Sequence, residues 1–265
     1  MLKLETKGMV RGQRTLVAPV DVCFANGALT MVLGANGAGK SSLLSLLAGT
    51  ASPSDLKHTR VVFSLENGTH DLTASDLVLS ELPLAKRAQQ LAVLTQQNPL
   101  DFAFRVADVV TMGAYPLGLS ASELQQKLAQ VLEVCDLVSL AEQAYTQLSG
   151  GERQRVHVAR VLMQVGKTTK ALLLDEPLTA LDLKHQHQIL AHLRKLADEG
   201  LCVVTVLHDP ELAARYGHEL LLLKQGEVLA HGPCQALWQS HLLSALYDME
   251  IRADSVNELP RLTVL

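Results

Sequence analysis

The sequence predicts an α/β fold in which a parallel sheet is covered by helices on both faces. Near-continuous apolar strands at Ala171–Leu174, Leu201–Leu207 and Glu219–Leu223 alternate with helical segments in the second half of the chain. This alternation is typical of parallel sheets, because the crossover helices bury both faces of each strand. The chain has 265 residues, enough for one large domain with a substantial core.

The N-terminal part is predicted to contain strands around one helix. Apolar or β-branched runs predict extended segments at Leu2–Phe24, Ala28–Leu33, Arg60–Asp71 and Leu91–Leu94. Asn67-Gly68 is a typical hairpin turn. Between these strands, the apolar stretch Lys40–Ala48 is predicted to be a helix.

A helical insert is predicted to interrupt the α/β core. Apolar residues at positions i, i+3 and i+4 predict helices at Ala107–Met112, Ser122–Cys135 and Glu152–Met163. We therefore interpret 1–265 as one domain, with 1–97 and 166–265 as the core and 98–165 as the insert. The core is expected to continue with helices at Leu183–Ala197 and Pro210–Tyr216, a hairpin turn at Lys224–Glu227, and short helices after Pro233.

Composition excludes several classes of function. The net charge is −4 and no long basic run is present, so no nucleic-acid partner is expected. The longest apolar runs are far shorter than the ~20 residues of a membrane-spanning helix. Four widely spaced cysteines, with no CxxC pair, favour reduced thiols in the cytosol. The N-terminus lacks an apolar signal core, so export is not expected.

A glycine-rich turn carries the clearest chemical signal. The run GANGAGKS at 34–41 matches G-x-x-x-x-G-K-[ST] and lies between a predicted strand and a predicted helix, the context in which this pattern binds phosphate. Glycines let successive backbone N–H groups point at phosphate oxygens, and the helix N-terminus adds partial positive charge. Lys40 is expected to reach the β and γ phosphates, and the Ser41 hydroxyl to ligate Mg²⁺. The predicted nucleotide-binding residues here are Gly34, Ala35, Asn36, Gly37, Ala38, Gly39, Lys40, Ser41 and Ser42.

Two carboxylates end the apolar strand that begins at Ala171. Asp175 is suited to hold Mg²⁺ through water, because magnesium prefers oxygen ligands and keeps part of its hydration shell. Glu176 points elsewhere and can take a proton from an attacking water. An acidic strand exit is common in α/β proteins, but the phosphate loop upstream favours the catalytic interpretation.

His208 follows the next strand along the chain. Two neighbouring strands would therefore deliver Glu176 and His208 to the same edge of the sheet, where ligands of parallel sheets bind. We predict that His208 contacts the γ-phosphate and holds the water in line. His185 and His187 are two apart on a predicted helix, so they face different ways and form a poor metal pair.

The run LSGGE at Leu148–Glu152 predicts a second anion site. Ser149 is a good helix N-cap, and the two glycines expose backbone N–H groups at a positive helix end. One chain cannot easily bring two such sites onto one phosphate, whereas a two-fold dimer places each nucleotide between the phosphate loop of one copy and the Ser149 helix of the other. An ordinary glycine-rich N-cap is the alternative for this motif alone.

Together these motifs resemble the ABC ATPase family. The phosphate loop, Gln96 after a strand, LSGGE, LLLDEP, the Thr179–Asp182 loop and His208 occur in the family's order over nearly the whole chain. The resemblance implies a P-loop NTPase (RecA-like) core with an antiparallel β subdomain and an inserted α-helical subdomain, binding ATP and Mg²⁺. It implies that Glu176 is the catalytic base, that Gln96 senses Mg²⁺ and the γ-phosphate, and that Asp182 lies between protomers. The residues implied to reach the other copy's nucleotide are Ser149, Gly150, Gly151 and Glu152.

Within that family, the chain is most similar to ATPases of bacterial importers for iron chelates, heme and cobalamin. The segments 109–116, 148–161, 181–190 and 206–216 look like the hemin-importer subunit in particular. The resemblance implies a peripheral subunit on the cytoplasmic face of the inner membrane, working with two multi-span permease subunits and, indirectly, a periplasmic or surface substrate-binding protein. The helical insert would form the groove that grips a permease coupling helix. Ferric siderophores and cobalamin are alternative cargoes.

Several positions depart from the family pattern. Ala35 stands where proline is common, and Glu152 stands where glutamine is commoner. Pro210 stands two residues after His208, where the family usually has Leu or Asn-Leu. The N-terminal aromatic residue that usually stacks on adenine is absent, with Gly8–Val10 in its neighbourhood. This departure implies weaker adenine affinity and looser base selectivity.

Two rival classes share part of this pattern. A small-molecule kinase would share the phosphate loop but needs neither LSGGE nor a second copy. Non-transport ABC ATPases usually carry a long coiled-coil insert or two ATPase units in one chain, and this sequence has neither.

Overall fold

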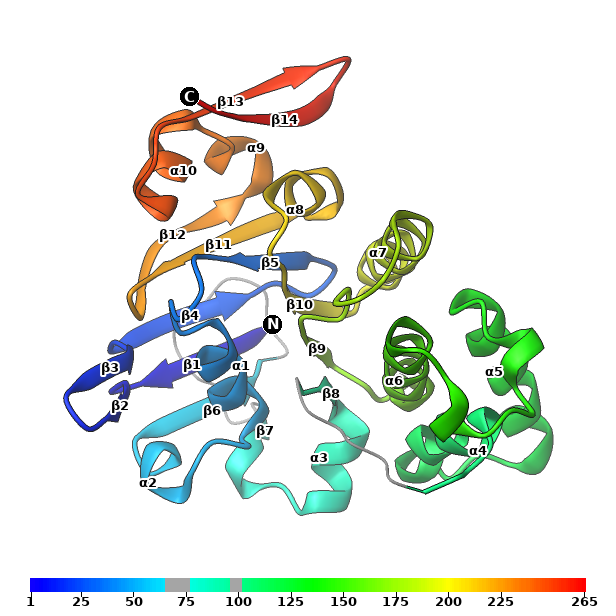
Figure 1. Ribbon diagram of the computed structural model, residues 1–265. Coiled ribbons are helices and arrows are strands. Elements are labelled where there is room, and N and C mark those ends of the chain that lie inside the picture. The colour runs from blue at the N-terminus through cyan, green and yellow to red at the C-terminus, as the bar shows by residue number, and fades with distance from the viewer. Residues whose placement is uncertain (65–76, 96–101) are drawn as a thin grey trace.

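The computed structural model describes residues 1–64, 77–95 and 102–265, and its centre is a six-stranded sheet (Figure 1). The strand order is β12-β11-β5-β10-β9-β8. Strands β11 to β8 run parallel, and β12 pairs antiparallel with β11 at one edge. The strands are β5 (Leu29–Leu33), β8 (Leu91–Leu94), β9 (Ala171–Asp175), β10 (Cys202–Val206), β11 (Glu219–Lys224) and β12 (Glu227–Pro233). The predicted parallel sheet and its final hairpin are therefore confirmed.

A smaller antiparallel sheet, built from N-terminal strands in the order β4-β1-β6-β7, lies beside the six-stranded sheet. A separate hairpin, β2–β3, extends from it. These strands are β1 (Leu2–Thr6), β2 (Met9–Arg11), β3 (Arg14–Val17), β4 (Val20–Phe24), β6 (Thr59–Phe63) and β7 (Leu77–Val78). They form the antiparallel β subdomain that the sequence predicts. The predicted Asn67-Gly68 turn lies outside the described residues.

The five parallel strands of the large sheet are buried on both faces, which explains their continuous apolar sequences. In β5, Val32 packs with the leucines of helix α1 (Lys40–Ala48) and with Phe24 of the small sheet. Met31, on the opposite face, joins a second core that includes Leu190 of helix α7 (Leu183–Asp198). Both faces therefore exclude water, as crossover helices require. The other helices around the core are α2 (Pro53–Leu56), η1 (Leu79–Glu81), α3 (Leu84–Gln90) and α8 (Pro210–Tyr216).

The predicted helical insert forms a separate group of helices beside β8 and β9 (Figure 1). It contains α4 (Val106–Thr111), η2 (Met112–Leu117), α5 (Ala121–Val134), η3 (Val138–Leu140), η4 (Tyr145–Gln147) and α6 (Gly150–Gln164). Helix α6 contacts α4, α5 and η2 as well as strand β8. It therefore connects the insert to the core, and the exact division at 98 and 165 stays a prediction.

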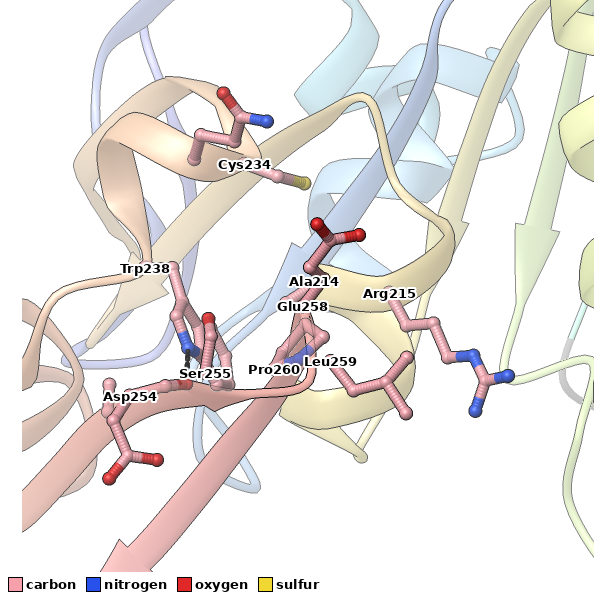
Figure 2. A pocket seen from close by; sticks show the side chains of 11 residues that line it. Ala214, Arg215, Cys234, Trp238, Asp254, Ser255, Glu258, Leu259 and Pro260 are labelled. Atoms are coloured by element: carbon pink, nitrogen blue, oxygen red, sulfur yellow. Dashed lines mark hydrogen bonds between the residues drawn. The ribbon is translucent and has the colours of Figure 1, made fainter.

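The C-terminal segment adds a hairpin that the sequence analysis did not predict. After α9 (Cys234–Leu237) and α10 (Ser240–Tyr247), strands β13 (Ile251–Val256) and β14 (Leu259–Val264) pair antiparallel. Asn257 and Glu258 both have positive φ at the turn, without the glycine that usually signals one. Trp238 Nε1 donates to the backbone carbonyl of Asp254 at 3.0 Å, beside a cavity of about 440 Å³ (Figure 2).

No helix in the described ranges is long and apolar enough to cross a membrane.

Candidate nucleotide-binding site

The phosphate loop joins the end of β5 to the start of α1, as predicted. Gly37 and Gly39 have φ of 77° and 102°, a left-handed region that favours glycine. A Cβ on Gly39 would lie 2.1 Å from the backbone oxygen of Leu16, so a side chain cannot fit there. The loop therefore needs glycine for both its turn and its close approach to β3.

Lys40 is buried at the base of this loop. Its Nζ donates to the backbone oxygens of Gly34 at 2.7 Å and Ala35 at 3.1 Å. Burial lowers the pKa of Lys40, and the nearby carboxylates Glu176 and Asp175 act in the opposite direction. A cation with so little solvent around it is well placed to gain from a phosphate anion.

Ser41 and Asp175 face each other across the gap between α1 and β9. The Ser41 hydroxyl donates to Oδ1 of Asp175 at 3.1 Å. Burial raises the pKa of the Asp175 carboxyl, partly offset by the hydrogen bond from Ser41. One hydroxyl and one carboxylate are oxygen donors of the kind that Mg²⁺ accepts, so two of the predicted metal contacts, Ser41 and Asp175, do lie together.

Glu176 and His208 are in direct contact. His208 Nε2 lies 2.7 Å from Oε1 of Glu176, and the glutamate side chain is 18% exposed. Glu176 has a φ of 50°, an unusual conformation for a residue other than glycine. Its backbone oxygen accepts a hydrogen bond from Gln154 Nε2 at 3.3 Å. The neighbouring strands β9 and β10 therefore bring the two predicted catalytic side chains together.

Lys40, Ser41, Glu176 and His208 line one cleft of about 470 Å³. Its lining includes two residues that the sequence analysis missed, Arg14 and Leu16 of β3. Nη2 of Arg14 donates to the backbone oxygen of Gly37 at 2.8 Å. No sequence pattern marks this arginine, because its place above the loop depends on how the β2–β3 hairpin packs. The lining residues are Arg14, Leu16, Asn36, Gly37, Gly39, Lys40, Ser41, Ser42, Glu176 and His208.

Comparison with protein families agrees with this geometry. Residues 17–179 match the model of the family described as ABC transporter, and this match spans the phosphate loop, the LSGGE motif and the Asp175–Glu176 pair. The chain belongs to the ABC transporter family.

Curated relatives in this family resemble the chain over almost its full length. The hemin import ATP-binding protein HmuV of Pseudomonas fluorescens (strain Pf0-1) is 40% identical over 95% of this chain and 94% of its own length. The protein of the same name from Vibrio cholerae is 41% identical over 85% of this chain and 83% of its own length.

Solved structures support the fold. The dimeric cassette MJ0796, in a post-hydrolysis state bound to ADP and Pi, has a TM-score of 0.71 at 26% identity, over 88% of this chain and 99% of its own. A putative metal-chelate type ABC transporter in an inward-facing conformation has a TM-score of 0.73 at 26% identity, over 100% of this chain and 96% of its own. The chain is thus an ABC-type ATPase with the predicted fold.

The LSGGE motif of this ABC ATPase begins helix α6, and Ser149 is its N-cap. Glu152 folds back on the motif: its Oε2 accepts from the Ser149 backbone N–H at 2.8 Å and from the Ser149 hydroxyl at 2.7 Å. The hydrogen bond from Ser149 lowers the pKa of Glu152. No residue of the motif is among those lining the nucleotide cleft of the same chain.

The Thr179–Asp182 loop passes close to this motif. A Cβ on Gly151 would lie 2.7 Å from the backbone oxygen of Ala180, so a side chain there would push the loop away. Asp182 ends the loop as the N-cap of α7, accepting from the His185 backbone N–H at 2.9 Å. Gln96, the remaining predicted nucleotide and metal contact, lies outside the described residues.

The two histidines of α7, His185 and His187, contact different neighbours. His187 Nδ1 meets the hydroxyl of Tyr216 at 2.7 Å, whereas His185 contacts Asp136 and Asp182. Across the described ranges, His, Cys, Asp and Glu side chains form no group of three or more that could hold a metal ion.

Proposed function

We propose that this chain is the ATP-hydrolysing subunit of a bacterial ABC importer that takes up hemin across the inner membrane. The carrying observation is the convergence of Lys40, Glu176 and His208 on one cleft, in a chain 40% identical to a hemin import ATP-binding protein over 95% of its length.

Lys40 and the phosphate loop hold the triphosphate of ATP in this proposal. The loop directs backbone N–H groups into the cleft, and the buried Lys40 exchanges its carbonyl contacts for β and γ phosphate oxygens. The oxygens of Ser41 and Asp175 would hold Mg²⁺, which supplies positive charge beside the phosphates when bound. Gln96 is proposed as a further contact to Mg²⁺ and the γ-phosphate, on the basis of its family position.

Glu176 is proposed as the general base. A carboxylate oxygen at the mouth of the cleft can take a proton from the water that attacks the γ-phosphate. His208 Nε2 lies 2.7 Å from Oε1 of Glu176 and keeps this carboxylate oriented. The imidazole can also reach the γ-phosphate itself. The positive φ of Glu176 aims its side chain at the cleft while β9 continues into the next loop.

A second copy of the chain is proposed to complete the site. Ser149, Gly150, Gly151 and Glu152 lie apart from their own cleft, so they are free to contact the nucleotide held by the other copy. ATP can favour the closed pair only if its γ-phosphate gains contacts there that it lacks in the open pair. Asp182, 64% exposed, would lie between the two copies.

The helical insert is proposed to dock two multi-span permease subunits, which places the ATPase on the cytoplasmic face of the membrane. A hollow of about 410 Å³ is lined by Met112, Tyr115 and Leu119, and Tyr115 is 90% exposed. An exposed aromatic in a concave apolar surface is suited to receive a helix from a partner. A periplasmic or surface substrate-binding protein would deliver the cargo to the permease.

The proposal is tested by Glu176→Gln. We expect ATP binding and pairing of two copies to persist while hydrolysis falls by roughly two to four orders of magnitude, because the amide cannot accept the proton. Phosphate release and sedimentation with ATP measure the two effects. Normal ATP hydrolysis by this variant would contradict the assignment of Glu176 as the general base.

Ferric siderophores and cobalamin are the alternative cargoes, and the likeness to a putative metal-chelate type transporter favours keeping them. The complex of this chain with its permease, in lipid vesicles, would be supplied with binding protein loaded with each ligand. We expect hemin to stimulate ATP hydrolysis most strongly. Stimulation by cobalamin or a siderophore alone would reassign the cargo.

The partners of the chain distinguish the proposed transport ATPase from a small-molecule kinase and from a non-transport ABC ATPase. A kinase active as one chain would show an ATPase rate per chain that does not depend on protein concentration, whereas a shared site requires pairing. Capture of this chain from detergent-solubilised membranes together with a multi-span protein is expected only of a transport ATPase.

A further inference from the structure

A cluster of charged residues lies where the helical insert meets the loop that follows Glu176. Asp136, Asp182, Lys184 and His185 form this junction, and none of them lines the nucleotide cleft. Asp136 follows α5 in the insert, whereas the other three lie at the start of α7 in the core. The junction therefore joins two parts of the chain that are far apart in sequence.

The imidazole of His185 lies between two carboxylates. Its Nε2 is 3.1 Å from Oδ2 of Asp136, and its Nδ1 is 2.7 Å from Oδ1 of Asp182. A neutral imidazole carries a single N–H, so only the protonated ring donates to both carboxylates at once. The side chain of His185 is 15% exposed, whereas the side chains of Asp136 and Asp182 are 49% and 64% exposed.

A lysine shares one of these carboxylates with the imidazole. Lys184 Nζ lies 2.7 Å from the same Asp136 oxygen that His185 contacts. Hydrogen bonds from Lys184 and His185 lower the pKa of Asp136 to about 2. The backbone hydrogen bond from His185 is the main cause that lowers the pKa of Asp182. Both carboxylates therefore remain charged at neutral pH.

The insert side of the junction is anchored to the LSGGE helix. Arg155 of α6 is buried and donates to the backbone oxygens of Cys135, at 2.9 Å, and of Asp136. Asp136 has a φ of 53°, a conformation that costs free energy for a residue other than glycine and that these contacts hold in place. Contacts thus run without a break from α6 through Asp136 and His185 to Asp182.

We propose that His185 is a positioning residue that ties the Asp182 loop to the helical insert, so that a displacement of the insert reaches the surface between the two copies. The proposal rests on the proposed function, in which the insert docks the permease and Asp182 lies between protomers. A contiguous polar network with one shared side chain can carry such coupling. Nucleotide binding within one chain does not depend on it, because the junction lies outside the cleft.

The test uses the complete complex of this chain with its permease in lipid vesicles and compares His185→Leu with His187→Leu. His187 is on the same helix but contacts Tyr216, so it controls for loss of an imidazole from α7. We expect His185→Leu to lower kcat of the complex about tenfold with KM for ATP unchanged. ATP affinity of the isolated chain should also be unchanged, and His187→Leu should leave kcat near that of the natural protein.

A double-mutant cycle separates coupling from unrelated damage. Asp136→Asn should lower kcat like His185→Leu, and the double variant should be no worse than either single one. Additive losses, an equal loss in His187→Leu, or full kcat in His185→Leu would each overturn the proposal. If His185→Leu does not fold, His185→Gln replaces it and should give an intermediate loss, because glutamine keeps at most one of the two bonds. Failure of the proposed function is distinct, since the natural chain would then form no complex with a permease.

Discussion

The two predicted anion-binding regions of the chain differ in how complete they are within one copy. At the phosphate loop, Lys40, Ser41 and the Glu176–His208 pair already line one cleft, and Asp175 accepts from the Ser41 hydroxyl. The LSGGE motif does not line that cleft, and the Glu152 carboxylate already occupies the Ser149 donors.

This difference has a physical consequence. The phosphate loop is built to bind nucleotide in a single chain, because its donors and its buried cation are positioned by strand β5 and helix α1. In the proposed pair, the LSGGE end gains a ligand only when the second copy brings one, and Glu152 would then give up part of its contact with Ser149. Binding and pairing should therefore respond separately to substitutions in the two regions.

The largest effect is expected at the complete site, with Lys40→Ala. Removal of the buried cation should weaken ATP binding by about 100-fold or more, because a charge-assisted contact in a shielded site contributes several kcal/mol. Calorimetric titration of the isolated chain with ATP measures it. Lys195→Ala, at a 70% exposed position on α7, is the matched control and should bind normally. Equal affinity in Lys40→Ala would contradict the phosphate-loop assignment.

Asp175→Asn should act on the metal rather than on the nucleotide alone. We expect the rate of ATP hydrolysis at limiting Mg²⁺ to fall about tenfold or more, because a neutral amide is a weaker ligand for a hard cation. Because burial raises the pKa of Asp175, its carboxylate takes up a proton at a higher pH than an ordinary aspartate. The apparent Mg²⁺ affinity should therefore fall as pH is lowered toward that pKa, and this acid-side fall should vanish in Asp175→Asn. Mg²⁺ titrations at several pH values test both statements.

Glu152→Gln sharpens the comparison at the incomplete site. Removing one negative charge near the predicted γ-phosphate position should favour ATP-dependent pairing by a few-fold, while ATP affinity of the single chain stays the same. The measurement compares the fraction of dimer formed with ATP by the Glu176→Gln variant and by the double variant that also carries Glu152→Gln. Weaker pairing in the double variant would instead make the Glu152–Ser149 contact a requirement for the paired state.

The smallest effect is expected for Arg14→Ala. Its guanidinium lies above the phosphate loop at the edge of the cleft and is solvent-exposed, so its loss should weaken ATP binding by about threefold. A guanidinium plane can also stack on a nucleobase, so comparing ATP with GTP separates a base contact from a phosphate contact. An equal loss for both nucleotides indicates the phosphate.

Helix and strand positions were largely predictable because their causes are local. The helix at Lys40–Ala48 has the same bounds in the structure as in the prediction, since a glycine turn precedes it and Gly49 ends it. The C-terminal hairpin was not predictable in the same way. Its exposed strands alternate weakly, its turn lacks glycine, and its position is set by contacts such as Leu262 N–H to Glu211 Oε1.

The sequence by itself determined which residues form the proposed nucleotide site, because the proposed loop, metal and base residues lie in motifs whose spacing allows few other arrangements. Only the tertiary structure decided which distant side chains meet. Arg14 reaches the phosphate loop through the packing of a hairpin, and His185 bridges Asp136 and Asp182 through the packing of α5 against α7. Contacts between segments so far apart along the chain depend on the whole fold, which no local pattern contains.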